Sequence, residues 1–189
     1  IEDIDDADEE HDNWYSKAII TYGQMLQSIN KDKEAEKYFK AAINLGKDND
    51  GDSYYAYAKF LEKKGNMELA LKNYIEASKK GHKMAANDYA VTLLTKVDGK
   101  DPDPADVKKA IQELKKASQQ NQPAACTNYG NILFSGKYKQ KKNQTLAVNL
   151  FRQAAEKDYP DGCFMLGYAL SHGEDVEEDK ESAKKYFKK

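Results

Sequence analysis

The segment GCFMLGYALSHGEDVEEDKESAKKYFKK, residues 162–189, contains the pattern that decides the fold. Gly162 lies one helical turn before a bulky and small pair, Leu166 and Gly167, so these residues fall on one side of a helix. A short loop follows, and then Ala183 precedes the aromatic residues Tyr186 and Phe187. The segment therefore predicts two helices, A and B, that pack closely where their side chains are small.

The same pattern recurs along the rest of the chain. Its pairs are separated by 35, 32, 40 and 37 residues, and they are Tyr22-Gly23, Tyr57-Ala58, Tyr89-Ala90, Tyr129-Gly130 and Leu166-Gly167. A period of this length is typical of helical repeat arrays, which usually act as binding surfaces. The first four predicted B helices each have two alanines seven residues apart, or two turns, at 35 and 42, 70 and 77, 110 and 117, and 147 and 154.

The last unit resembles a Sel-one-like repeat, a relative of the tetratricopeptide repeat. Nine positions match that pattern in register, and Asp175 departs from it by replacing the second loop glycine; the matches are Gly162, Leu166, Gly167, Gly173, Val176, Asp179, Ala183, Tyr186 and Phe187. The first three units are more degenerate and equally resemble tetratricopeptide repeats. The resemblance implies an all-α fold, a right-handed α/α solenoid of about five antiparallel helix pairs. We expect one array over 14–189, with units at about 14–51, 52–82, 83–121, 122–159 and 160–189.

Residues 1–13 differ from the array in charge. They hold eight acidic residues and no lysine or arginine, whereas the chain as a whole has a net charge of −2. We expect an acidic leader or a short capping helix, and an acidic lure for a basic partner is the alternative. The chain begins with isoleucine and stops one residue short of the next repeat alanine, so we expect a piece of a longer array.

Residues that support catalysis or bind cofactors are scarce. The three histidines share no short motif with cysteine or with one another, and the acidic stretch at 48–52 lacks a carboxylate at the twelfth position of a calcium loop. We therefore expect no enzyme activity, no metal and no cofactor. Lysine makes up 29 of the 30 basic residues, which disfavours nucleic-acid binding, and no apolar run is long enough for membrane insertion.

The resemblance implies that the A helices line a concave face that binds a protein or peptide. Asparagine amides there can clamp a peptide backbone, and aromatic side chains can receive apolar side chains. Carried onto this chain, the candidate groove residues are Tyr55, Lys59, Asn87, Thr127, Asn131, Phe164 and Tyr168.

The predicted function is a non-catalytic adaptor or scaffold for protein–protein interaction. A structural subunit of a large assembly is one alternative. Another is a quality-control adaptor in the lumen of the endoplasmic reticulum, since the resemblance includes a ubiquitin-ligase adaptor there. Cys126 and Cys163 occupy equivalent positions in stacked helices, about 9–10 Å apart and too far for a disulfide, which favours the cytoplasm. The glycosylation sequon Asn143-Gln-Thr145 favours the lumen. The oligomeric state is not predicted.

Overall fold

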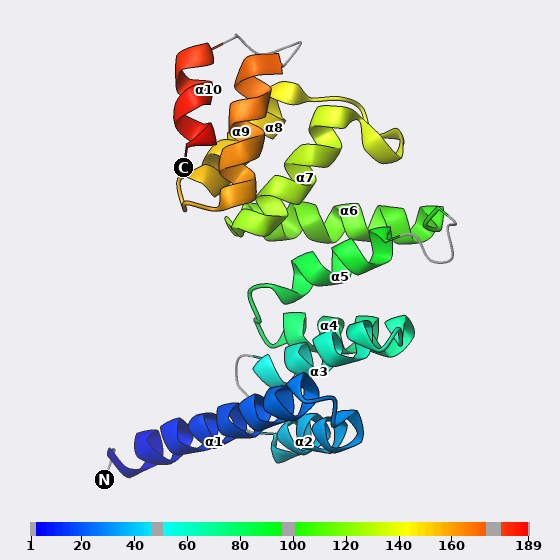
Figure 1. Cartoon of the computed structure of the whole chain (residues 1–189), viewed down its shortest axis with the longest axis vertical. Helices are drawn as coiled ribbons and strands as arrows, with labels where there is room; N and C mark the ends of the chain where they lie inside the picture. Colours follow the sequence, from blue (N-terminus) through cyan, green and yellow to red (C-terminus); the bar gives the residue numbers. More distant parts are fainter. Residues whose placement is uncertain (1–2, 47–50, 96–100, 173–178, 189) are drawn as a thin grey trace. The chain divides into compact units, whose positions relative to one another are not determined.

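The computed structural model describes residues 3–46, 51–95, 101–172 and 179–188, in two compact units, 1–92 and 93–189. All of its regular elements are helices (Figure 1). The α-helices are α1 (Asp3–Ser28), α2 (Asp32–Leu45), α3 (Asp52–Lys63), α4 (Met67–Lys79), α5 (Ala85–Leu94), α6 (Pro104–Gln119), α7 (Pro123–Ser135), α8 (Gln144–Ala155), α9 (Pro160–His172) and α10 (Lys180–Phe187), and η1 (Lys137–Lys139) is a 3₁₀ turn.

Helical hairpins build both units. In the N-terminal unit α1 packs on α2 and α3 on α4, and α2 also contacts α3. In the C-terminal unit α7 packs on α8 and α9 on α10, with α8 against α9 and α6 against α7. The helices expected for a unit at 83–121 are present as α5 and α6, although the boundary between the two units falls inside α5.

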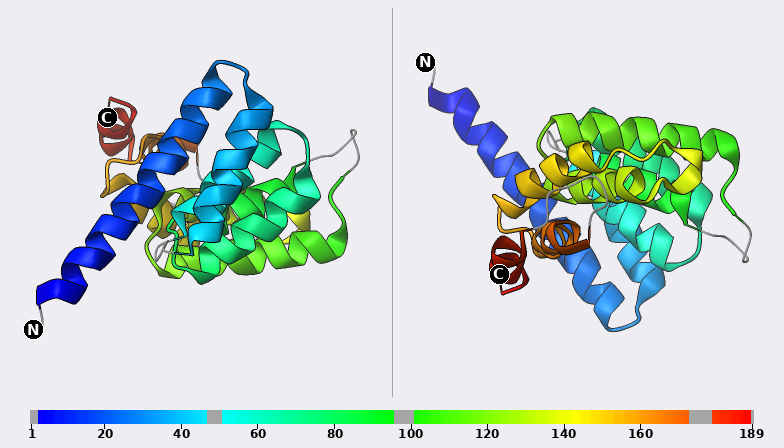
Figure 2. Two further views of the ribbon diagram at one scale, coloured as in Figure 1. Left: turned by 90° about the horizontal axis from the view of Figure 1, so that it is seen from below. Right: turned by 90° about the horizontal axis from the view of Figure 1, so that it is seen from above.

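Helix α1 is longer than its partner. It has 26 residues against 14 in α2, and its backbone continues without interruption from Asp3 into the first predicted repeat (Figure 2). The backbone of residues 3–13 is therefore helical. The division into a leader and an array stays a prediction.

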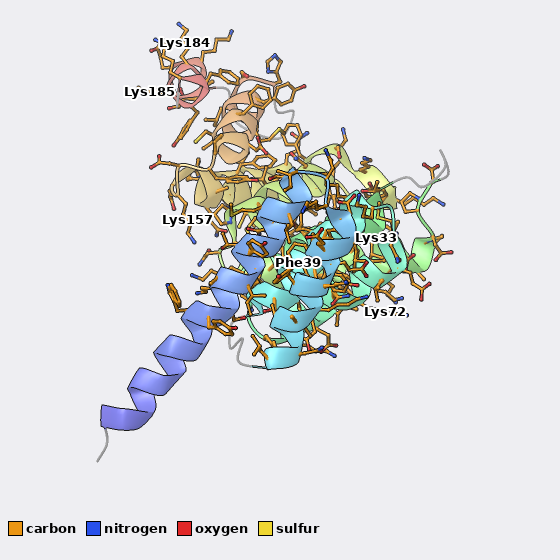
Figure 3. The ribbon with its side chains drawn as sticks, turned by 60° about the horizontal axis from the view of Figure 1, so that its bottom comes forward. Lys33, Phe39, Lys72, Lys157, Lys184 and Lys185 are labelled. Atoms are coloured by element: carbon orange, nitrogen blue, oxygen red, sulfur yellow. The ribbon has the colours of Figure 1, made fainter. Side chains whose placement is uncertain are left out.

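The alanine stripes predicted for the B helices form their buried faces. All eight alanines are at most 1% exposed, at positions 35, 42, 70, 77, 110, 117, 147 and 154. Alanine exposes no polar group and lets a neighbouring backbone approach closely, so two alanines at a spacing of two turns give a smooth contact strip. The bulky residues between them, such as Phe39 (labelled in Figure 3) and Phe151, fill the interior.

In three A helices, a glycine makes room for an aromatic ring of the B helix in the same hairpin. A Cβ atom added at Gly23 would lie 3.0 Å from the Phe39 ring, and one added at Gly130 would lie 2.5 Å from Phe151. The same holds for Gly167, where the distance to Phe187 would be 3.0 Å. These glycines cost about 1 kcal/mol each in helix propensity, and the close packing of the ring compensates for it.

Several helix starts carry the caps that the sequence indicates. The Asp103 carboxylate accepts a hydrogen bond from the Ala105 amide at 2.7 Å, with Pro104 at the first helical position of α6. Asn143 and Asp179 cap α8 and α10 in the same way, each accepting from the amide three residues later at 3.0 Å. Such caps satisfy amides that have no partner within the helix, and they set where each helix begins.

Gly162→Ala is expected to destabilise the C-terminal unit. The new Cβ would lie 2.5 Å from the Cβ of Ala154 and 3.2 Å from its carbonyl carbon, and neither atom can rotate away. Helix α9 must then move off α8, which costs about 1–3 kcal/mol, more than the gain in helix propensity of at most about 1 kcal/mol. Chemical denaturation should report the loss.

A double-mutant cycle separates this contact from other effects. Adding Ala154→Gly removes the colliding Cβ, so the pair should be more stable than the sum of the two single variants predicts. Additive effects of the two substitutions would contradict this account of α8–α9 packing.

Candidate functional site

The candidate groove residues fall into two groups, one in each unit. Tyr55 and Lys59 lie on α3 and Asn87 on α5, in the N-terminal unit. Thr127 and Asn131 lie on α7, and Phe164 and Tyr168 on α9, in the C-terminal unit. Each group is described separately, and its role in binding stays a prediction.

In the N-terminal group, Asp88 joins all three predicted residues. The Tyr55 hydroxyl donates to Asp88 Oδ2 at 2.8 Å, and Lys59 Nζ lies 3.6 Å from the same oxygen. The Asn87 amide donates to Asp88 Oδ1 at 3.1 Å. Sequence reasoning missed Asp88. Residue spacing does not show which acidic side chain of α5 comes within reach of α3, and the fold reveals it.

A second carboxylate extends this polar network. Glu62 Oε2 accepts from Tyr74 Oη and from Lys59 Nζ, both at 2.8 Å, and Glu62 Oε1 accepts from Thr92 Oγ1 at 3.2 Å. Burial acts to raise the pKa of Glu62, but the hydrogen bonds from Lys59 and Tyr74 outweigh it, and the pKa lies below its usual value. Lys59 shows the converse: burial acts to lower its pKa, and the bonds to Glu62 and the charge of Asp88 raise it.

The two tyrosines of the network hold their protons tightly. Burial raises the pKa of Tyr55, and its hydrogen bond to Asp88 raises it further. Burial and the hydrogen bond to Glu62 do the same for the pKa of Tyr74. The Tyr55 ring also stacks on His82, with ring centroids 3.9 Å apart. Tyr55 is therefore fixed on its ring and on its hydroxyl.

Exposure differs sharply within the N-terminal group. Asn87 is 5% exposed and offers little surface to a partner, whereas about half of the Lys59 side chain reaches solvent. The hydrogen bond from Tyr55 to Asp88 joins α3 to α5, whereas the bond from Asn87 to Asp88 lies within α5. In this group, Lys59 is the predicted residue with the most surface for binding.

The C-terminal group divides in a similar way. Thr127 is 3% exposed, and its hydroxyl donates to the Pro123 carbonyl at 3.0 Å within its own helix. The side-chain oxygen of Asn131 is buried and has no hydrogen-bond partner among the described residues. Phe164 and Tyr168 lie one turn apart on α9 and are 57% and 40% exposed. Their rings are the accessible part of this group.

Neighbouring aromatic rings hold Phe164 and Tyr168 in place. Phe164 packs on Phe187 of α10, with centroids 5.7 Å apart. Tyr168 meets Phe134 of α7 edge to face at 6.1 Å and stacks on His172 at 4.8 Å. We call Phe134, Phe164, Tyr168 and Phe187 the aromatic surface. Phe187, which is 47% exposed, was predicted only as a packing residue, and its exposure has no signal in the sequence.

No group of three His, Cys, Asp or Glu residues in the described part of the chain is placed to hold a metal ion. Cys126 and Cys163 are buried and free, as predicted. Over the described ranges, no helix is both long enough and apolar enough to cross a membrane.

Comparison with known proteins agrees with this repeat architecture. The sequence model of the Sel1 repeat family matches residues 18–47, 49–82, 123–159 and 160–189. The chain belongs to the Sel1 repeat family. The predicted unit at 83–121 lies outside these Sel1 matches.

Solved Sel1-type structures confirm the predicted α/α solenoid class. One is c5321, a protective antigen of uropathogenic Escherichia coli with an SLR fold, at a TM-score of 0.75, 25% identity, and coverage of 92% of this chain and 37% of that one. Another is a Sel1 repeat protein from Oxalobacter formigenes, at a TM-score of 0.70 and 19% identity, covering 94% of this chain and 76% of that one.

A curated Sel1-type relative comes from Candida glabrata. It is the ERAD-associated E3 ubiquitin-protein ligase component HRD3, which is 31% identical over 128 residues. That match covers 65% of this chain and 15% of the relative. The chain thus spans a small part of the relative's length.

Tyr74→Phe should change how stability depends on pH. The folded-state pKa values of Tyr55 and Tyr74 lie above the unfolded value of about 10, so their contribution is fully present below pH 10 and is lost as pH rises above it. Removing the Tyr74 hydroxyl should cost about 1–2 kcal/mol at pH 7, because it donates to a charged group. The fall in stability above pH 10 should become shallower.

Melting curves between pH 7 and 11 measure both effects. Tyr15→Phe is the matched control, since Tyr15 is 52% exposed, and it should leave the curve unchanged. An alkaline slope in Tyr74→Phe equal to that of the parent chain would contradict the assignment.

Proposed function

We propose that this chain is a non-catalytic adaptor that binds a segment of a partner protein on the aromatic surface of its C-terminal unit. The family supports the coarser statement, because Sel1 repeat proteins are typically protein-interaction adaptors. The observation that carries the finer one is the exposure of Phe164 and Tyr168, two large rings one turn apart that neighbouring rings hold in place.

Equivalent repeat positions on α7 and α9 support this location. Phe164 on α9 occupies the same repeat position as Thr127 on α7, which is buried. A side chain at this repeat position can therefore be covered by neighbouring groups. A partner segment with apolar side chains would bury Phe164 as the protein interior buries Thr127.

Aromatic residues suit such a role energetically. Tyrosine and tryptophan dominate the binding energy of many interfaces, and rigid rings lose little entropy when a partner binds.

Replacing Phe164 and Tyr168 together by serine should remove partner binding while the unit stays folded. Losing two anchor rings should weaken affinity at least tenfold, or by about 1.4 kcal/mol or more. The measurement is affinity purification from native extract with quantitative mass spectrometry, followed by titration of the partner found.

Leu146→Ser is the matched control, because Leu146 is 40% exposed in the same unit but lies on helix B, α8. It should retain the partner. A double variant that retains the same partners with unchanged affinity would rule out the aromatic surface as the binding site.

A second candidate places this adaptor in the lumen of the endoplasmic reticulum, as part of a ubiquitin-ligase complex in protein quality control. The similarity to HRD3 supports it. Asn143 of the predicted sequon is exposed, and its side-chain oxygen caps α8 by accepting from the Leu146 amide. A glycan attaches to the side-chain nitrogen, so glycosylation and the cap are compatible.

Glycan occupancy separates the lumen from the cytoplasm. Thr145→Ala destroys the sequon but keeps Asn143 and its cap, whereas Thr145→Ser preserves the sequon. Lumenal protein from its native source should lose mass on endoglycosidase treatment, as should Thr145→Ser but not Thr145→Ala. Unchanged mass in all three would favour the cytoplasmic adaptor.

A further inference from the structure

The C-terminal unit contains a groove that the proposed function does not use. Its volume is about 580 Å³, and it lies between the start of α6 and the turn that follows α7. The lining residues are Asp101, Pro102, Pro104, Val107, Lys108, Ile111, Gln112, Lys137, Tyr138, Lys139 and Gln140. The part contributed by α6 lies outside the segments that match the Sel1 repeat.

The groove combines apolar side chains with positive charge. Val107, Ile111 and Tyr138 contribute partly buried apolar surface. Three lysines line it against a single carboxylate, Asp101. Some lysines described elsewhere pair with a carboxylate, as Lys109 does with Asp106 at 3.7 Å.

The lysines of the groove differ from those pairs. Lys108 and Lys139 have no carboxylate partner among the described residues, and Lys137 lies over the Tyr138 ring, 4.9 Å from its centroid. Tyr138 and Lys139 both have left-handed backbone conformations, with φ of 56° and 59°. Such conformations are unfavourable outside glycine and asparagine and concentrate at functional sites. The turn therefore keeps a strained backbone where it presents a ring and a positive charge to the groove.

This chain also carries a segment with the complementary chemistry. Residues 1–13 hold eight carboxylates, and in the sequence Ile1, Ile4 and Ala7 recur at intervals of three residues. The backbone of residues 3–13 is helical, in the part of α1 by which that helix exceeds α2 in length. An acidic segment with aliphatic side chains complements an apolar groove bordered by lysines. Its aliphatic side chains suit the apolar lining, and its carboxylates suit the positive charge of the lysines.

We propose that the groove binds the acidic segment 1–13 of a second copy of this chain. The aliphatic side chains contact Val107, Ile111 and Tyr138, and the carboxylates pair with the lysines of the groove. This contact is head to tail, because a segment of one copy meets a different surface of the next. Head-to-tail contacts form rings or open chains rather than closed dimers. The proposal is independent of the aromatic surface.

Two variants and their mixture test the proposal. The groove variant Lys108→Glu, Lys139→Glu keeps an intact acidic segment, and the segment variant Asp5→Asn, Asp6→Asn, Asp8→Asn, Glu9→Gln keeps an intact groove. Analytical ultracentrifugation of the parent chain should show association that grows with concentration and weakens at least about tenfold between 50 and 500 mM salt. Each variant alone should be monomeric.

The equimolar mixture gives the sharpest result. One variant still donates a segment and the other still accepts it, so association should return and stop at a one-to-one complex. Lys115→Glu, Lys116→Glu is the matched control, since both lysines are exposed on α6 outside the groove, and it should associate like the parent chain.

Several outcomes would overturn the proposal. They are a parent chain that stays monomeric at all concentrations, a groove variant that associates like the parent, and a mixture that stays monomeric. If the groove variant melts at a lower temperature, the milder Lys108→Gln, Lys139→Gln replaces it, with the same expectation.

Discussion

Close approach of two helices at small side chains is the constraint on which this structure depends. A ring of helix B occupies the space that a side chain of helix A would take, as Phe151 does above Gly130. The alanines of the B helices remove the side-chain bulk that would otherwise separate neighbouring hairpins. The helices can then pack closely, and buried rings such as those of Phe39 and Phe151 fill the interior.

Contacts between successive hairpins obey the same constraint. Gly162 of α9 lies against Ala154 of α8, so a glycine and an alanine set the distance between two hairpins. In the N-terminal unit the corresponding contact is polar: the hydroxyls of Ser16 and Ser53 lie 3.1 Å apart and are both buried. A hydroxyl is small enough to fit and gains a hydrogen bond, whereas a larger side chain would separate α1 from α3.

Much of this architecture could be predicted from the sequence, because packing imposes a period. The alanine stripes, the glycines beneath the rings and the cap at Asp103 all follow from spacing and from residue type. The candidate site could be predicted only in part, because a repeat position fixes which helix a residue lies on but not what covers it. Asn87, Thr127 and Phe164 share one repeat position, yet Asn87 and Thr127 are buried and Phe164 is mostly exposed.

The remaining features depend on contacts that no spacing rule contains. Asp88 organises Tyr55 and Lys59 because α5 brings a carboxylate within reach of α3, and only the fold shows which acidic residue arrives there. Tyr138 and Lys139 could be read as part of a lysine-rich loop, but neither residue type favours the left-handed backbone that both adopt.

The two units differ in the contacts that their polar groups and aromatic side chains make, and this difference bears on function. The N-terminal unit pairs its carboxylates internally: Glu62 and Asp88 accept hydrogen bonds from Tyr74 and Tyr55, so these aromatic hydroxyls are used for stability. The C-terminal unit leaves Phe164 and Tyr168 exposed, and Asn131 has an acceptor that no described residue uses. Unsatisfied groups and exposed rings lower stability unless another molecule covers them. The exposed rings of the C-terminal unit therefore gain stability when a partner covers them.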